Sequence, residues 1–173
     1  MKFTSNMQNQ VLEFHKLFGH PISEKPTLPT LERYTNRKGW GSIEEAVEQL
    51  FTLSNSVEEF EATIDTLHTY LDKAKEKQLQ KEIITDETEK VVALADGLAD
   101  ELYFLLGDCV EAGIDIEPIL SIVQNSNLSK LFKDEHGNKY AKSNEFGKVI
   151  KSPEFFEPEP FIEEEVLRQL NKK

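Results

Sequence analysis

Three glutamates in the stretch GSIEEAVEQL are the first side chains in this sequence that could do chemistry. In a helix, residues three or four apart share a face, so Glu44, Glu45 and Glu48 would present their carboxylates on one side of its first two turns. Acidic residues at a helix start are also favoured by the helix dipole and by capping, which is the alternative interpretation. The glutamates alone therefore do not establish a site.

Two aspartates in the stretch ADGLADELYFLLGD form the second candidate. Asp96 and Asp100 lie one helical turn apart in the most apolar segment of the chain, and the same strip continues through Tyr103 and Gly107. Aspartate is a poor residue for a helix interior, and an unpaired buried carboxylate is costly. A strip that faces solvent would explain the pair, but exposed helix positions more often carry Glu, Lys or Gln.

The two acidic sets suggest one site if their helices pack together. Five carboxylates cannot all be ionised in close proximity without a counter-charge. Hard divalent cations supply that charge, because Mg²⁺ takes oxygen ligands and a pair of ions roughly 4 Å apart suits phosphoryl displacement. The sequence thus predicts a Mg²⁺ site, with Mn²⁺ as the alternative ion.

A lysine-rich segment, residues 130–151, is the third feature. Its six lysines face only three acidic residues, a local charge of +3 in a chain of net charge -12. Solvated loop lysines would account for it, and so would lysines that bind phosphate oxygens. The lysines are Lys130, Lys133, Lys139, Lys142, Lys148 and Lys151.

The composition restricts the class of protein. A chain of 173 residues fits one domain, residues 1–173, with enough length to bury a core. Its net charge of -12 repels polyanions, so no nucleic-acid partner is expected. Cys109 is the single cysteine and is interpreted as a core thiol, and no apolar run reaches the roughly 18 residues of a membrane span. A cytoplasmic protein without a membrane partner is the expectation.

The apolar spacing predicts an all-α fold, a bundle of about four to five main helices. Two Ser-x-x-Glu patterns, at Ser42 and Ser56, are interpreted as capping boxes that each start a helix. The segment from about residue 85 to 112 is apolar on more than one face, which predicts a central helix covered on several sides. Helices are also expected at 4–19, 43–53, 56–80, 118–124 and 161–171, with an extended connection at 21–30 and a loop or short hairpin around residues 136–138.

The order of these motifs resembles the all-α nucleoside triphosphate pyrophosphohydrolases, a superfamily that includes MazG-like enzymes, dimeric dUTPases and phosphoribosyl-ATP pyrophosphohydrolases. The resemblance covers most of the chain. It rests on EExxE, DxLADxLY, GID, SNLSKL and GKVIKSPEFFEPEP, in that order, after the lead-in VLEFHKLFGHPISEKPTLP.

The resemblance implies Mg²⁺-dependent hydrolysis of a nucleoside triphosphate between the α and β phosphates, giving a nucleoside monophosphate and pyrophosphate. The ExxE motif of the family matches Glu45 and Glu48, with Glu44 beside it as an acid that ligates a further ion or orients water; orienting or deprotonating water is the role chosen for it. The family's second motif, ExxD, ends at Asp100, but its first acid falls on Gly97, so Asp96 would take that role. The resemblance also implies a homodimer.

Four further residues follow from the resemblance as substrate contacts. Asn127 and Lys130 fall where related proteins contact the nucleotide, and Lys148 and Lys151 fall where lysines bind phosphate. Trp40 could stack on a base, although a packed core tryptophan is the simpler interpretation. The base itself is left open by the sequence.

Two other classes of protein share part of this pattern. A di-iron bundle needs Glu-x-x-His pairs on two helices, and the chain offers only an Asp-x-x-His at His68. A non-catalytic helical module that binds a nucleotide or a protein is the second alternative. Pyrophosphate release from a panel of nucleoside triphosphates with Mg²⁺ distinguishes this module from the enzyme.

Overall fold

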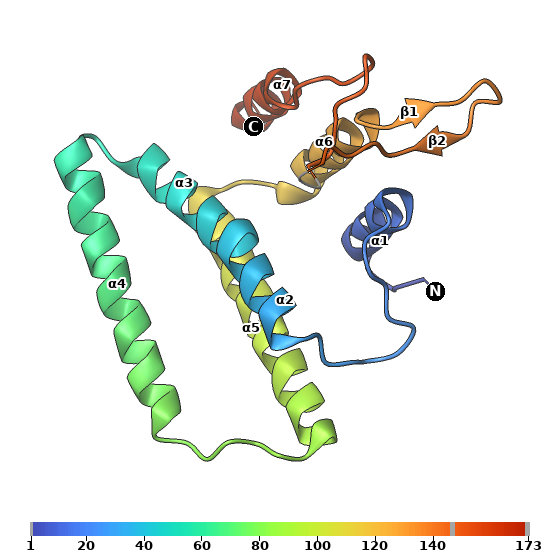
Figure 1. The fold of residues 1–173 in the computed structure, drawn as a ribbon. Coiled ribbons are helices and arrows are strands. Elements are labelled where there is room, and N and C mark those ends of the chain that lie inside the picture. Colours follow the sequence, from blue (N-terminus) through green and yellow to red (C-terminus); the bar gives the residue numbers. More distant parts are fainter. Residues whose placement is uncertain (1, 146–147, 172–173) are drawn as a thin grey trace. The chain divides into compact units, whose positions relative to one another are not determined.

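The computed structural model describes residues 2–145 and 148–171, and it is mostly helical, which confirms the all-α prediction (Figure 1). The chain divides into two compact units, residues Met1–Lys25 with Gly97–Lys173, and residues Pro26–Asp96, and each is described by itself. The helices are α1 (Asn6–Phe18), α2 (Leu31–Arg37), the π-helix η1 (Lys38–Ile43), α3 (Glu44–Leu53), α4 (Val57–Leu79), α5 (Glu87–Ala112), α6 (Ile116–Ser129) and α7 (Glu159–Leu170); the strands are β1 (Phe132–Lys133) and β2 (Lys139–Tyr140).

Helix α1 begins and ends where local chemistry predicts. The Ser5 side chain accepts a hydrogen bond from the Gln8 backbone N–H, and Gly19 ends the helix at φ 69°. Glycine adopts this left-handed conformation without the steric cost that a Cβ would add. The helix packs against α6 and buries Leu12, which with Leu131 forms the buried apolar core of this unit.

Helix α6 is longer than the expected 118–124 segment. It starts before Pro118, since proline is tolerated in a first turn, where its missing N–H has no helical partner. The asparagine- and serine-rich stretch after Gln124 continues the helix instead of ending it. Helix α6 therefore carries the SNLSK sequence to its own C-terminal end.

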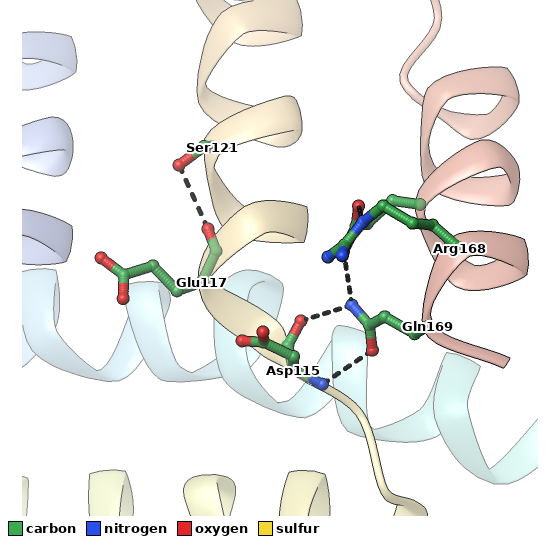
Figure 2. Close-up of polar contacts among 6 residues, drawn as sticks. Asp115, Glu117, Ser121, Arg168 and Gln169 are labelled. Carbon is green, nitrogen blue, oxygen red and sulfur yellow. Dashed lines mark hydrogen bonds and ion pairs between the residues drawn. The ribbon is translucent and has the colours of Figure 1, made fainter. Parts of the chain in front are cut away.

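Helix α7 is fastened to the start of α6 through a side-chain amide (Figure 2). The Gln169 amide accepts a hydrogen bond from the Asp115 N–H at 2.9 Å and donates one to the Asp115 carbonyl at 2.9 Å. Its nitrogen also donates to Glu165, which pairs with Arg168. One glutamine thus ties both backbone groups of Asp115 to α7.

The lysine-rich segment contains a short antiparallel hairpin, one of the two structures expected there. Strands β1 and β2 pair Phe132 with Tyr140. Asp134 closes the connection, because its carboxylate accepts hydrogen bonds from the backbone N–H groups of His136 and Asn138. Gly137 lies at φ 80°, a conformation that favours glycine.

In the second unit, α2, η1 and α3 follow one another without a break (Figure 1). The capping box at Ser42 was therefore a wrong prediction. Ser42 lies inside the π-helix, and the residues that flank η1, Arg37 and Glu44, both have right-handed helical backbone angles. Because no helix end occurs there, the Ser42 side chain has no free N–H groups to cap.

The capping box at Ser56 is confirmed with one difference. The Ser56 hydroxyl accepts from the Glu59 N–H at 3.1 Å and starts α4. The Glu59 carboxylate reaches back one residue further than expected and accepts from the N–H and the side-chain amide of Asn55, at 2.7 and 3.0 Å. These hydrogen bonds lower the pKa of Glu59.

The prediction that helix α5 is covered on several sides by other helices is wrong for the single chain. None of its residues is buried. Tyr103 and Phe104 are 78% and 72% exposed. The core interpretation of Trp40 is also wrong, because this side chain is 62% exposed. The described helices include none long and apolar enough to cross a membrane.

Candidate functional site

The three glutamates lie at the start of α3, in its first two turns. All three are exposed. Helix α3 continues directly from the π-helix η1, and no side chain caps its start. The preceding helix therefore determines where the three glutamates lie. The spacing of Glu45 and Glu48, three apart, and of Glu44 and Glu48, four apart, gives one carboxylate-bearing face.

Asp96 and Asp100 lie in the middle of α5 and are exposed as well. Gly97 stands between them, and a Cβ at this position would meet no neighbouring atom within 4 Å. Asp96 belongs to the unit that contains α3, and Asp100 to the other unit. Their spacing places both carboxylates on one side of α5.

The chemistry of these five acids suits a hard divalent cation. Within residues 2–145 and 148–171, no side-chain hydrogen bond or ion pair involves the carboxylates of Glu44, Glu45, Glu48, Asp96 or Asp100. Oxygen ligands without a protein counter-charge are what Mg²⁺ binds. Among the described residues, no group of three or more His, Cys, Asp or Glu is arranged to hold a metal ion. The five carboxylates thus have the oxygen donors that Mg²⁺ prefers, without a preformed metal-binding cluster in this part of the chain.

A basic cluster forms where α6 ends. The Lys130 ammonium donates to Asn127 Oδ1 at 2.6 Å, one turn earlier on the same helix. Lys130 is half-buried, and this burial lowers its pKa; the nearby charge of Lys151 lowers it further, while Glu157 opposes the shift. The two residues expected from the SNLSK sequence are thus in contact with each other.

The segment after Lys151 is held against the end of α6 by buried serines. The Ser152 hydroxyl donates to the Ser129 carbonyl at 2.7 Å, and the Ser152 N–H donates to the Lys130 carbonyl at 3.2 Å. The Ser126 hydroxyl donates to the Phe156 carbonyl at 2.8 Å. Ser126 and Ser152 are 3% and 6% exposed. These bonds explain why residues more than twenty positions apart meet.

Phe155 is the residue that both cluster lysines approach. The ammonium nitrogens of Lys151 and Lys130 lie 4.0 and 5.8 Å from the centroid of its ring. The face of an aromatic ring is negative, so it attracts both cations. The Lys151 ammonium also pairs with the Glu157 carboxylate at 3.0 Å. Lys130, Lys151, Asn127, Phe155 and Glu157 are called the Phe155 cluster below.

Lys148, the remaining lysine expected at the site, lies outside this cluster. It is exposed, and its backbone N–H donates to Asn144 Oδ1 at 2.9 Å. No contact in the described part of the chain joins its ammonium group to Phe155 or Asn127. The structure therefore brings together Asn127, Lys130 and Lys151, and does not add Lys148.

Sequence reasoning missed Phe155, Glu157 and the two buried serines. The stretch KSPEFFEPEP enters the sequence analysis only as part of a family motif. Its aromatic residue four positions after a lysine was a usable signal, because cations commonly stand over aromatic faces. Nothing in the local sequence indicated that this stretch would meet Lys130.

Comparison with known proteins agrees with these features. The family model for phosphoribosyl-ATP pyrophosphohydrolase matches residues 11–127, more than half of the chain. A crystal structure named "putative NTP pyrophosphohydrolase", from Exiguobacterium sp. 255-15, is 37% identical and covers 96% of each chain with a TM-score of 0.88. No curated protein matches this chain.

Proposed function

Because this chain belongs to the phosphoribosyl-ATP pyrophosphohydrolase family, within the all-α NTP pyrophosphohydrolases, we propose that this pyrophosphohydrolase acts on a nucleoside triphosphate with Mg²⁺. Water attacks the α-phosphorus, the bond between that phosphorus and the α–β bridging oxygen breaks, and a nucleoside monophosphate and pyrophosphate leave. The observation that carries the proposal is the set of five exposed carboxylates without protein counter-charge, in a chain of this family.

The acidic residues divide into two roles. Glu45, Glu48, Asp96 and Asp100 would hold Mg²⁺, as hard oxygen ligands. When bound, the ion supplies positive charge for the phosphate oxygens and lowers the pKa of water. Glu44 is the residue assigned to orient the attacking water and to accept its proton. It is exposed and adjacent to Glu45, one of the four proposed ligands, so its carboxylate can reach a water held beside them.

The basic residues bind the substrate in this proposal. Lys130 and Lys151 contact phosphate oxygens as point charges, and Asn127 holds Lys130 in place or contacts the nucleotide. Lys148 is a further phosphate contact, implied by its place in the family motif. These assignments rest on the resemblance, and for three of the four residues also on the contacts of the Phe155 cluster.

A nucleotide panel tests the proposed reaction. The protein is incubated with Mg²⁺ and dUTP, dCTP, the common nucleoside triphosphates or phosphoribosyl-ATP, and pyrophosphate is assayed. Pyrophosphate release with a matching monophosphate supports the enzyme. If no nucleotide is cleaved, the non-catalytic binding module becomes the better account.

Two variants test the acidic site. Glu48→Gln and Asp100→Asn each keep the shape of the side chain and remove one charge, so both should abolish most Mg²⁺-dependent pyrophosphate release while the helical circular dichroism signal persists. Glu61→Gln on α4 is the matched control, because this exposed glutamate lies outside both acidic sets. Full activity in both Glu48→Gln and Asp100→Asn would contradict the assignment of these acidic residues as Mg²⁺ ligands.

A homodimer is part of the proposal. Helix α5 carries apolar residues on more than one face, and in the single chain none is buried. Exposed apolar surface of this kind marks an interaction site, and a second copy offers a helix with the same apolar surface. Light scattering during gel filtration should give twice the mass of 19.9 kDa. Phe104→Glu should shift the protein to a monomer, and a monomeric wild type would end this part of the proposal.

A further inference from the structure

One carboxylate already lies among the cations of the Phe155 cluster. Glu157 pairs with Lys151 at 3.0 Å, and it also opposes the lowering of the Lys130 pKa, so both lysines experience its charge. Both partners of the Lys151–Glu157 pair are more than half exposed. A pair this exposed exchanges readily with other ions in solution, because it is worth only a fraction of a kcal/mol to about 1 kcal/mol.

The ring beneath the lysines has a different effect. Phe155 attracts both ammonium groups without neutralising them, since a quadrupole carries no net charge. Its backbone is fixed through the N–H bond to the Ser152 carbonyl at 3.1 Å. The ring therefore keeps two cations near one place, and burial there deprives Lys130 of part of its hydration.

We propose that Glu157 is a resident counter-ion that an incoming polyphosphate displaces from Lys151, and that Phe155 is the positioning residue that keeps Lys151 and Lys130 together for that polyphosphate. The inference rests on the proposed function, which supplies a polyphosphate as ligand. It assigns roles to two residues that act through the lysines. Glu157 lowers the affinity for the polyphosphate, and Phe155 raises it.

Binding of inorganic pyrophosphate without divalent metal, measured by isothermal titration calorimetry at low ionic strength, tests the role of Glu157. Glu157→Gln removes the competing charge, so it should bind pyrophosphate about two- to fivefold more tightly than the control. The matched control is Glu154→Gln, which makes the same change in net charge three residues away. Glu154 pairs with Lys133, at 2.7 Å, and not with Lys151.

The outcomes separate a counter-ion from a merely structural residue. Loss of a structural contact would weaken binding, whereas removal of a counter-ion strengthens it. If Glu157→Gln binds no more tightly than Glu154→Gln, or if the wild-type protein binds no pyrophosphate, the inference is wrong. Neither result bears on whether the protein cleaves a nucleotide of the panel with Mg²⁺. Absence of that cleavage would instead contradict the proposed function.

Two substitutions at Phe155 test the positioning role. Phe155→Leu keeps an apolar side chain but loses the negative ring face, and it should weaken pyrophosphate binding severalfold. Phe155→Tyr retains the ring and should bind as the wild type does. Unchanged binding in Phe155→Leu would contradict the positioning role, and circular dichroism checks that each variant is folded. If Phe155→Leu does not fold, Phe155→Met takes its place, because it also lacks the ring face; weaker pyrophosphate binding is expected, and unchanged binding would contradict the positioning role.

Discussion

The hydroxyl of Ser152 is a single group whose removal should affect both stability and substrate binding. It is 6% exposed, donates to the Ser129 carbonyl at 2.7 Å and accepts from the Glu154 N–H at 3.1 Å. Ser152→Ala removes both hydrogen bonds and leaves a carbonyl and an N–H without these partners. Each net hydrogen bond is worth about 1 kcal/mol, so the free energy of unfolding should fall by about 1 to 3 kcal/mol.

The same change should raise KM. The Ser152 bonds hold Lys151 and Phe155 beside Lys130, so a looser segment places the two ammonium groups less often at one position. We expect KM for a cleaved nucleoside triphosphate to rise more than kcat falls, because the acids of α3 and α5 are untouched. This pattern indicates a loss of binding common to the ground state and the transition state.

Urea unfolding followed by circular dichroism measures the stability change. Ser54→Ala is the control, because the half-buried Ser54 hydroxyl makes one bond, to the Leu50 carbonyl of its own helix, at 2.8 Å. It should cost less than Ser152→Ala and leave KM unchanged. If Ser152→Ala is no less stable than Ser54→Ala, the buried serines do not fasten the segment.

Three further predictions concern the caps and turns. Ser56→Ala should lower the free energy of unfolding by about 1 kcal/mol in urea, since it removes the α4 cap, and an unchanged midpoint would contradict this. Gln169→Ala should release α7 and speed amide exchange there, while equal exchange rates would show that the Asp115 bonds do not hold the helix. The Asp134 pKa is held below its ordinary 3.8, mainly by hydrogen bonds from Asn138. The ionised Asp134 carboxylate therefore stabilises the fold fully above pH 3.8, and this contribution is lost as pH falls through the lowered pKa. Asp134→Asn should show a shallower fall in Tm between pH 5 and 2 than the wild type, and identical plots of Tm against pH would contradict the lowered pKa.

Features determined by neighbouring residues were predictable from the sequence. The end of α1 at Gly19 and the cap at Ser56 each depend on side chains within a few positions of the helix terminus. Ser42 shows the limit of that reasoning. The same Ser-x-x-Glu pattern occurs there, but a cap needs a helix end, and the preceding helix runs through it.

Features that depend on distant partners were not predictable in the same way. The spacing in α5 shows where its apolar residues lie, but not which surface covers them. The prediction that other helices of the same chain cover them was therefore wrong. The Phe155 cluster depends on a segment that returns to α6 through Ser152 and Phe156. The charge of residues 130–151 suggested phosphate-binding lysines, but not which of them would lie together.

The π-helix before α3 determines the rotational phase of the acidic face. A π-turn contains one more residue per hydrogen-bonded loop than an α-turn, and one residue corresponds to about 100° of rotation about a helix axis. Relative to α2, the direction of Glu45 and Glu48 is therefore set by Lys38–Ile43. Deleting one residue from that turn would convert it to an α-turn and keep both carboxylates on the same side relative to α2, whereas an α-turn of the same length would rotate them by about 100°.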